Sequence, residues 1–186
     1  MSDDDRKLMQ CIQNGETGLF ERLVEKYRSG LLRFARSKLI DPADAEDIVQ
    51  EAIFAAYEAR DSYNPEFAFS TWLWTILLNL SHRWRHKTIR EKEIVSQAIE
   101  RAPRPDSSPA VGLNNLLSEE RNLRLIEFLA ELPESQADAI RLKFFGDLTF
   151  QEIADTMNCS LSGAKKRVKS GLLQLSEKLR DSGDDQ

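Results

Sequence analysis

The chain has 186 residues, of which 41% are hydrophobic and 31% charged, and a formal net charge of −5. This composition predicts a globular, soluble, helical protein rather than a disordered one, and the length suits two small domains. The longest apolar stretch, 72–78, is far shorter than the roughly 20 residues of a membrane-spanning helix, and the start MSDDDRK is acidic, unlike a signal peptide. We therefore expect a cytoplasmic protein.

The charges are unevenly distributed along the chain. Residues 41–58 contain six acidic and no basic side chains, whereas 82–92 and 161–180 are strongly basic. One acidic and two basic segments indicate two kinds of partner.

Residues that could bind a metal ion or form a disulfide are sparse. Cys11 and Cys159 are isolated, with neither metal-ligand nor disulfide-framework spacing. His82 and His86 stand at i and i+4, but no nearby residue completes a ligand set. We therefore predict no metal and no cofactor.

Apolar residues at helical spacing extend through most of the chain, without strand-like alternation. Helices are predicted over 7–14, 16–38, 42–60, 70–99, 113–132, 134–145, 150–157 and 161–180. Residues 102–112 are rich in Pro, Ser and Gly, which is typical of an exposed connection. Asp41, followed by Pro42, is expected to cap one helix, and Ser70 the next. We predict an all-α protein, with two small helical domains joined by a flexible linker.

The predicted helix at 42–60 has two different faces. Its apolar residues recur at helical spacing and are expected to face the core. The other face places a phenylalanine among polar groups: Asp47, Gln50, Glu51 and Phe54, at i, i+3, i+4 and i+7. The residues alone leave two interpretations open, a solvated acidic face with one stray ring or a binding stripe for a basic partner, anchored by Phe54.

The segment 63–92 combines aromatic rings with basic side chains. Its aromatic residues are Tyr63, Phe67, Phe69, Trp72, Trp74 and Trp84. Rings at helical spacing usually belong to a core, and we expect Trp72, Ile76 and Leu80 to be buried. Rings beside arginines also hold unstacked bases of single-stranded nucleic acid, and Asn79 and His82 are placed to join such a surface.

The segment 149–179 has the pattern of a helix-turn-helix. Thr149 and Glu152 have capping-box spacing, Ala154 is small where two helices would cross, and Asn158 tolerates a positive φ at the turn. Several polar residues would point outward near the start of the second helix, where a major-groove reader contacts DNA: Ser162, Lys165, Lys166, Lys169 and Ser170. A merely solvated basic face is the alternative interpretation of this helix.

Four ordered motifs resemble those of group IV (extracytoplasmic function, ECF) RNA polymerase sigma factors of the sigma-70 family. They are DAEDIVQEAIFAAYE (44–58), FSTWLWTILLN (69–79), ELPESQADAIRLKFF (131–145) and LTFQEIADTMNCSLSGAKKRV (148–168). The resemblance implies a helical region 2 domain at 1–95, which binds core polymerase and recognises and melts the minus-ten element. It further implies a linker at 96–117 and a region 4 domain at 118–186, whose helix-turn-helix recognises the minus-35 element.

The resemblance also implies roles for individual residues. The residues that grip the clamp helices of the largest polymerase subunit are Asp47, Gln50, Glu51 and Phe54, which favours the binding-stripe interpretation. The implied minus-ten DNA contacts are Tyr63, Phe69, Asn79, Arg83 and Arg85. The implied minus-35 DNA contacts are Ser162, Lys165, Lys166, Lys169 and Ser170.

The chain departs from the family pattern in two places. Residues 161–167 read LSGAKKR where the family commonly has VGTVKSR, and the loop at 62–69 differs from commoner versions. The promoter sequence and the base captured at the minus-ten element are therefore not transferred from the resemblance.

The predicted function is that of a sigma factor, which is not an enzyme, needs no cofactor, and has core RNA polymerase and promoter DNA as partners. Whether an anti-sigma factor also binds stays open. The alternative is an autonomous two-domain helix-turn-helix transcriptional regulator, whose N-terminal bundle would bind a ligand or another protein. Phe54 distinguishes the two functions, because only the sigma factor needs it to bind polymerase. No nucleophile motif or ligand set supports a hydrolase.

Overall fold

The computed structural model describes the backbone of residues 3–39, 41–98 and 124–181, and the side chains of 4–39, 41–87 and 124–180. Most of the predicted linker at 96–117, and the first part of the helix predicted at 113–132, lie outside the described residues. Within the described ranges all regular structure is helical, which confirms the all-α prediction.

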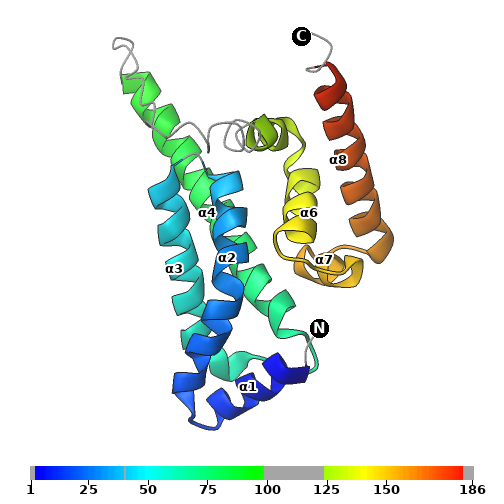
Figure 1. Ribbon diagram of the computed structural model, residues 1–186. Helices are drawn as coiled ribbons and strands as arrows, with labels where there is room; N and C mark the ends of the chain where they lie inside the picture. Colours follow the sequence, from blue (N-terminus) through cyan, green and yellow to red (C-terminus); the bar gives the residue numbers. More distant parts are fainter. Residues whose placement is uncertain (1–2, 40, 99–123, 182–186) are drawn as a thin grey trace, which may run out of the picture.

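The N-terminal half is a bundle of helices. Its elements are α1 (Asp3–Gln13), η1 (Thr17–Leu19), α2 (Phe20–Lys38), α3 (Pro42–Glu58), η2 (Arg60–Ser62) and α4 (Phe69–Ala98). The long helices α2, α3 and α4 lie side by side, and α1 crosses one end of them (Figure 1). The Asp41 carboxylate accepts a hydrogen bond from the Ala43 backbone N–H at 2.8 Å, with Pro42 in the first turn, so the predicted cap is confirmed.

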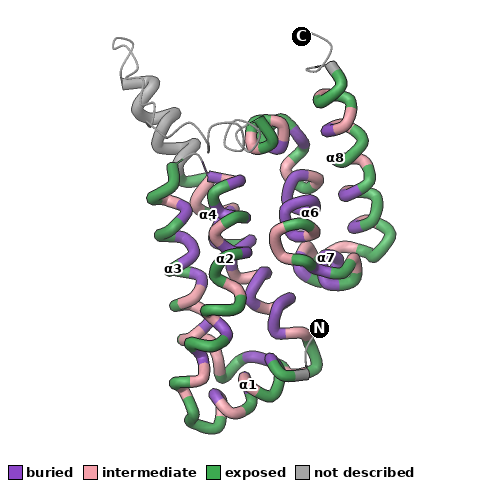
Figure 2. The backbone as a smooth tube through the Cα atoms, in the orientation of Figure 1, coloured by how far each residue is buried: buried purple, intermediate pink, exposed green. Residues whose placement is uncertain are grey.

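The C-terminal half is built around α6. A helix at 124–131 is followed by α6 (Glu134–Phe144), α7 (Phe150–Thr156) and α8 (Leu161–Asp181). Helix α6 contacts α8 within its own half and α2 in the other half, and α7 contacts α4. Residues 137–142 of α6 are all buried, and Figure 2 shows this burial as a nearly continuous band. Such a helix is buried all round because elements pack against it from both sides.

The two halves share a hydrophobic core, and the C-terminal half has a second, smaller one. Leu142, Leu148 and Ile153 belong to the same buried cluster as Leu31 and Phe34 of the N-terminal bundle. Because this cluster combines side chains from both halves, the halves pack against each other in the structure.

Trp74 and Gly30 lie where the halves meet. Trp74 is 1% exposed, and its indole Nε1 has no hydrogen-bond partner among the described residues. A Cβ atom placed on Gly30 would lie 2.7 Å from the backbone oxygen of Phe145, so only glycine lets α2 approach this closely.

Three side-chain predictions for α4 need correction. The helix begins at Phe69, so Ser70 lies inside it rather than capping it. The Ser70 hydroxyl instead donates to Oε1 of Glu152 at 3.1 Å, which links α4 to α7. Leu80 is buried as expected, but Trp72 and Ile76 are only half-buried, because they lie at the edge of the bundle core.

Candidate protein and nucleic-acid interfaces

Helix α3 has the two faces expected from its sequence. The inner face is buried and consists of Ala45, Ile48, Val49, Ala52 and Ala56. On the other face Phe54 is 61% exposed, and Asp47, Gln50 and Glu51 are also exposed. An exposed aromatic ring inside a rim of acidic and amide groups suits a basic protein surface, because the ring can enter a pocket while the acids select the partner's charge.

Two of the aromatic residues implied as DNA contacts lie in the core. Tyr63 is 3% exposed and Phe69 is 2% exposed, and their rings pack edge to face with centroids 5.9 Å apart. The Tyr63 hydroxyl donates to the backbone oxygen of Phe67 at 2.7 Å, and burial raises the pKa of this phenol. In this conformation the two rings support the loop before α4 and do not reach a surface where a base could stack.

Phe67 is an exposed ring in the same loop that was not among the predicted contacts. It is 55% exposed. It follows a turn in which the Glu66 N–H donates to Oδ1 of Asn64 at 2.9 Å. Gln13 holds this loop from α1 by donating to the backbone oxygen of Tyr63 at 3.0 Å. The sequence signal for an exposed loop here is the Asn64-Pro65 pair, which is typical of a turn.

The α4 residues implied as minus-ten contacts divide into two groups. Asn79 and Arg83, at i and i+4, are exposed on one face of the helix. Arg85 is half-buried, and its Nη1 lies 3.3 Å from Oε1 of Glu134 on α6. Two of the three side chains therefore face solvent, and the third is paired with the C-terminal half.

The helix-turn-helix has the predicted local geometry. The Thr149 N–H donates to Oε2 of Glu152 at 2.8 Å, and the Glu152 N–H donates to Oγ1 of Thr149 at 3.3 Å, so the capping box is formed. Asn158 has φ 47° at the turn. Ala154 and Ala164 are 1% and 0% exposed, because they lie where α7 and α8 pack together.

The outward side of α8 is basic. Ser162, Lys165, Lys166 and Lys169 are exposed, and Ser170 is half-buried. Beside these residues lies an open groove of about 300 Å³, lined by Phe150, Val168, Leu172 and Leu173 together with Lys165 and Lys169. Lysines along the start of such a helix can contact phosphates and base edges in a major groove.

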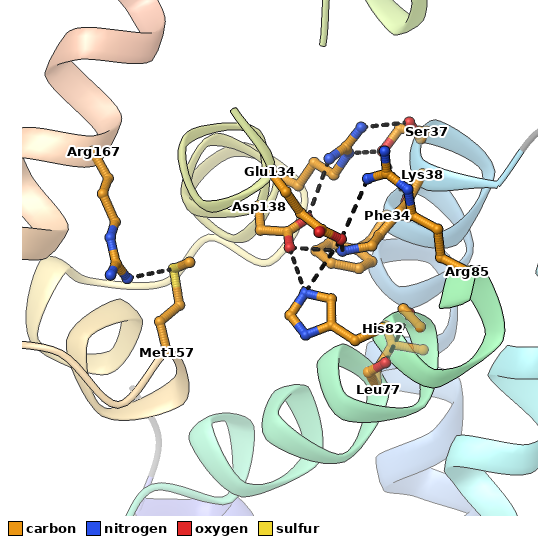
Figure 3. Close-up of polar contacts among 12 residues, drawn as sticks. Phe34, Ser37, Lys38, Leu77, His82, Arg85, Glu134, Asp138, Met157 and Arg167 are labelled. Atoms are coloured by element: carbon orange, nitrogen blue, oxygen red, sulfur yellow. Dashed lines mark hydrogen bonds and ion pairs between the residues drawn. The ribbon is translucent and has the colours of Figure 1, made fainter. Parts of the chain in front are cut away.

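A network of ion pairs that the sequence did not suggest joins the two halves (Figure 3). Asp138 on α6 lies at its centre: its Oδ2 is 2.6 Å from the Lys38 Nζ and 2.8 Å from the His82 Nε2. Its Oδ1 accepts from Arg141 at 3.2 Å, and Arg141 also donates to the Ser37 backbone oxygen at 2.8 Å. The side chains of Lys38 and Asp138 are 0% and 1% exposed, so this contact excludes water.

The same network contains three groups at metal-ligand spacing. The nearest ligand atoms of His82, Glu134 and Asp138 all lie within 4.8 Å of one another. The ammonium of Lys38 lies 2.6 Å from Asp138 and 3.0 Å from Glu134, so a cation already pairs with both carboxylates. Burial alone would raise the pKa of both carboxyl groups. The hydrogen bond from His82 and the charge of Lys38 nevertheless lower the pKa of Asp138 below its usual value, and Lys38 lowers that of Glu134.

The chain resembles known proteins along most of its length. The family models of Sigma-70 region 2 and Sigma-70 region 4 match residues 23–90 and 122–175. The RNA polymerase sigma-H factor of Pseudomonas aeruginosa is 26% identical over 89% of each chain. The ECF RNA polymerase sigma-E factor of Escherichia coli K12 is 30% identical over 88% of each chain. The chain belongs to the ECF sigma factors.

Two proteins of known structure share the fold of this ECF sigma factor. CnrH, solved in complex with the cytosolic domain of CnrY, superposes with a TM-score of 0.73 at 24% identity, covering 96% of this chain and 99% of that one. RpoE of Bartonella quintana, solved with the anti-sigma factor NepR, superposes with a TM-score of 0.66 at 24% identity. The match covers 87% of this chain and 96% of that one.

Residues 23–90 are hereafter region 2, which holds most of α2, all of α3 and most of α4, and residues 122–175 are region 4, which holds α6, α7 and most of α8. The presence of both regions identifies a transcription initiation factor that directs RNA polymerase to promoters, and the autonomous regulator is not supported. Among the described residues, no helix combines the length and apolar character needed to cross a membrane.

Proposed function

We propose that this ECF sigma factor binds core RNA polymerase through the exposed face of α3. The observation that carries the proposal is Phe54, which stays 61% exposed beside the exposed Asp47, Gln50 and Glu51. A large exposed ring within a cluster of polar groups can anchor a protein interface, and clustered acids choose a basic partner. The clamp helices of the largest polymerase subunit are the target that the family resemblance implies.

The minus-ten element is proposed to bind where α4 meets the preceding loop. Asn79 and Arg83 are exposed there, and the exposed ring of Phe67 offers a stacking surface for an unpaired base. Tyr63 and Phe69, which are buried, are assigned the role of supporting this loop. Arg85 joins the DNA-binding surface when it is released from Glu134.

We propose that α8 enters the major groove of the minus-35 element. Lys165, Lys166 and Lys169 supply the positive charge, and Ser162 and Ser170 supply hydroxyl groups for phosphates or base edges. In this assignment the domains extend over 1–95 and 118–186, joined by a linker at 96–117.

The proposal places the protein in the cytoplasm, where the promoters are, and gives it no catalytic chemistry of its own. The polymerase supplies the active site. An anti-sigma factor is a further proposed partner, because RpoE of Bartonella quintana, which shares this fold, was solved with one.

The test is retention of core RNA polymerase in a pull-down with the tagged full chain. Phe54→Ala should weaken retention about 30-fold, since loss of an interface anchor typically costs about 2 kcal/mol or more. Phe144→Ala is the matched control, because Phe144 is 60% exposed on α6, away from α3. Asp47→Arg should also weaken retention, whereas Glu25→Arg, at an exposed position on α2, should not.

Run-off transcription with core polymerase, on promoters selected from random DNA, completes the test. The Phe54→Ala variant should lose transcripts in proportion to its loss of core binding. Equal polymerase retention by the Phe54→Ala and Phe144→Ala variants would refute the assignment of α3.

A further inference from the structure

Helix α1 lies before the residues that match the region 2 model, yet it is firmly held on region 2. Met9 and Ile12 are buried in the shared core. The buried carboxylate of Asp5 accepts hydrogen bonds from the Lys26 Nζ and the Tyr27 hydroxyl of α2, each at 2.6 Å. Apolar packing and a buried polar contact thus hold the same helix, so α1 has one defined position on the bundle.

Gln13, the last residue of α1, contacts the loop before α4. Its side-chain amide donates to the backbone oxygen of Arg60 at 2.9 Å and to that of Tyr63 at 3.0 Å. These two oxygens lie at the first residue of η2 and directly after its end, so one amide joins both sides of this turn to α1. A glutamine amide has two N–H donors, and each of them has an acceptor here.

Tyr63 connects Gln13 to Phe67. The Tyr63 hydroxyl donates to the backbone oxygen of Phe67 at 2.7 Å, and the Phe67 N–H donates to the backbone oxygen of Asn64 at 3.1 Å. Burial raises the pKa of the Tyr63 phenol and the charge of Arg6 lowers it, so α1 also faces this ring. Both backbone groups of Phe67 are therefore held by residues 63 and 64, while its ring is left exposed.

An exposed ring on an unrestrained loop has many positions open to it, and ordering the ring on DNA costs conformational entropy. The hydrogen bonds from Gln13 and Tyr63 restrict the Phe67 backbone before DNA binds. A binding group whose support is fixed in advance loses less entropy when it contacts its ligand. The contacts of α1 therefore favour stacking of an unpaired base on this ring.

We propose that Gln13 is a positioning residue for minus-ten recognition, which holds the loop 60–67 on α1 so that the Phe67 ring is placed to stack on an unpaired base. Gln13 acts through Tyr63 and Phe67 and does not itself contact DNA. This inference rests on the proposed assignment of Phe67 to the minus-ten element.

Gln13→Met is the variant that tests this role. Methionine is close to glutamine in length, carries no N–H donor and leaves the charge unchanged. The loop would then lose both hydrogen bonds that join it to α1. Gln10→Met is the matched control, because it makes the same change at an exposed position of the same helix.

Two further variants act along the same path. Tyr63→Phe keeps the buried ring and removes only the hydroxyl that donates to Phe67. Tyr57→Phe is its matched control, because it removes the hydroxyl of a half-buried ring on α3. Phe67→Ala removes the exposed ring itself.

The experiment uses holoenzyme assembled from core RNA polymerase and each full-length variant. Fluorescence anisotropy gives the affinity for a fluorescein-labelled single strand that carries the minus-ten element of a promoter selected from random DNA. The same strand is tested with each nucleotide of the element made abasic in turn, which gives the contribution of every base. Core polymerase retention and circular dichroism verify that each variant is assembled and folded.

Phe67→Ala should weaken binding of the strand about tenfold and abolish the contribution of one base, because a stacking contact is lost. Gln13→Met and Tyr63→Phe should each weaken binding about fivefold and reduce the contribution of that same base. Neither should weaken binding further when combined with Phe67→Ala, because they act through the missing ring. The two control variants should match the native chain.

A purely stabilising role of Gln13 gives a different pattern. It would lower the amount of assembled holoenzyme and leave the contribution of every base unchanged, which would overturn the positioning role. Should Gln13→Met fail to assemble, Tyr63→Phe decides: unchanged base contributions in that variant would overturn the path from α1 to Phe67.

The positioning role and the proposed function can fail separately. Native affinity in the Gln13→Met holoenzyme, together with weakened binding by Phe67→Ala, would overturn the positioning role and leave the proposed function intact. A loss from Gln13→Met that persists undiminished beside Phe67→Ala would overturn it as well, since Gln13 would then act through another group. Native affinity in the Phe67→Ala holoenzyme would reject the minus-ten assignment of this ring, and the positioning role with it.

Discussion

The Nζ of Lys38 lies 2.6 Å from Oδ2 of Asp138, and neither side chain is more than 1% exposed. The two residues are 100 positions apart and belong to α2 and α6. A buried ion pair is favourable only while both charges are present, so each residue makes the stability of the contact between α2 and α6 depend on the other.

Lys38→Met should therefore destabilise the protein far more than the loss of an exposed ion pair. We expect a loss of about 3 kcal/mol in the free energy of unfolding, measured by urea denaturation. The buried carboxylate of Asp138 would keep its contacts with His82 and Arg141 but lose the positive charge of Lys38. Arg36→Met is the control: Arg36 pairs with Glu46 at 2.9 Å, but both side chains are about half exposed, so its loss should cost under about 1 kcal/mol. Similar losses in the two variants would contradict the importance of the buried pair.

The stability difference between the native chain and Asp138→Asn should depend on pH. The pKa of Asp138 is lowered in the folded state from its ordinary value of 3.8 by His82 and Lys38 acting against burial. A lowered folded pKa contributes stability that is complete above the unfolded pKa and is lost as pH falls through the folded one. The difference should hold from pH 7 to about 5 and shrink below about 4. Urea midpoints at each pH measure this stability difference. A difference that grew on acidification would contradict a lowered pKa of Asp138 in the folded state.

The capping box should contribute measurably to region 4. Thr149→Ala removes the hydroxyl that accepts from the Glu152 N–H, and loss of such a cap typically costs about 1 kcal/mol. Thr75→Ala makes the same change inside α4, where the hydroxyl only donates to the backbone oxygen of Thr71, so it should be nearly neutral. Thermal unfolding followed by circular dichroism compares the two, and the prediction fails if Thr75→Ala is the more damaging.

DNA binding by α8 should show the salt dependence of phosphate contacts. Lys166→Ala should lower the slope of log affinity against log salt concentration by about one, since one fewer cation displaces counterions. Arg180→Ala is the control, because Arg180 is an exposed base in the last turn of the same helix. The measurement uses holoenzyme and promoter DNA selected from a random pool. An unchanged slope for Lys166→Ala would exclude a phosphate contact by this residue.

Charge reversal at the same position separates DNA binding from polymerase binding. Lys166→Glu should abolish promoter-dependent transcription while core polymerase is retained as by the native chain. Loss of both properties would indicate misfolding rather than a DNA contact.

The features predicted correctly from the sequence are those determined locally. The spacing of Phe54 against Ala45 and Ile48 fixes which side of α3 faces water, since a helix repeats its faces every three to four residues. Asn158 and the Thr149 cap are likewise set by residues within a few positions.

The features that the sequence did not reveal depend on contacts between distant segments. Ser70 has the pattern of a cap, but its hydroxyl donates a hydrogen bond to Glu152, 82 positions away. Arg85 has the pattern of a DNA contact, and nothing near it in sequence indicates that Glu134 pairs with it. The burial of Tyr63 and Phe69 depends on how the loop folds back on the bundle, which periodicity does not encode.

The indole of Trp74 bears on the strength of the contact between region 2 and region 4. Its N–H is enclosed without an acceptor among the described residues, and an unsatisfied buried donor costs on the order of 1–3 kcal/mol. Because Trp74 lies against both Gly30 and Gly146, this enclosed donor lowers the net stability of the contact between the two regions.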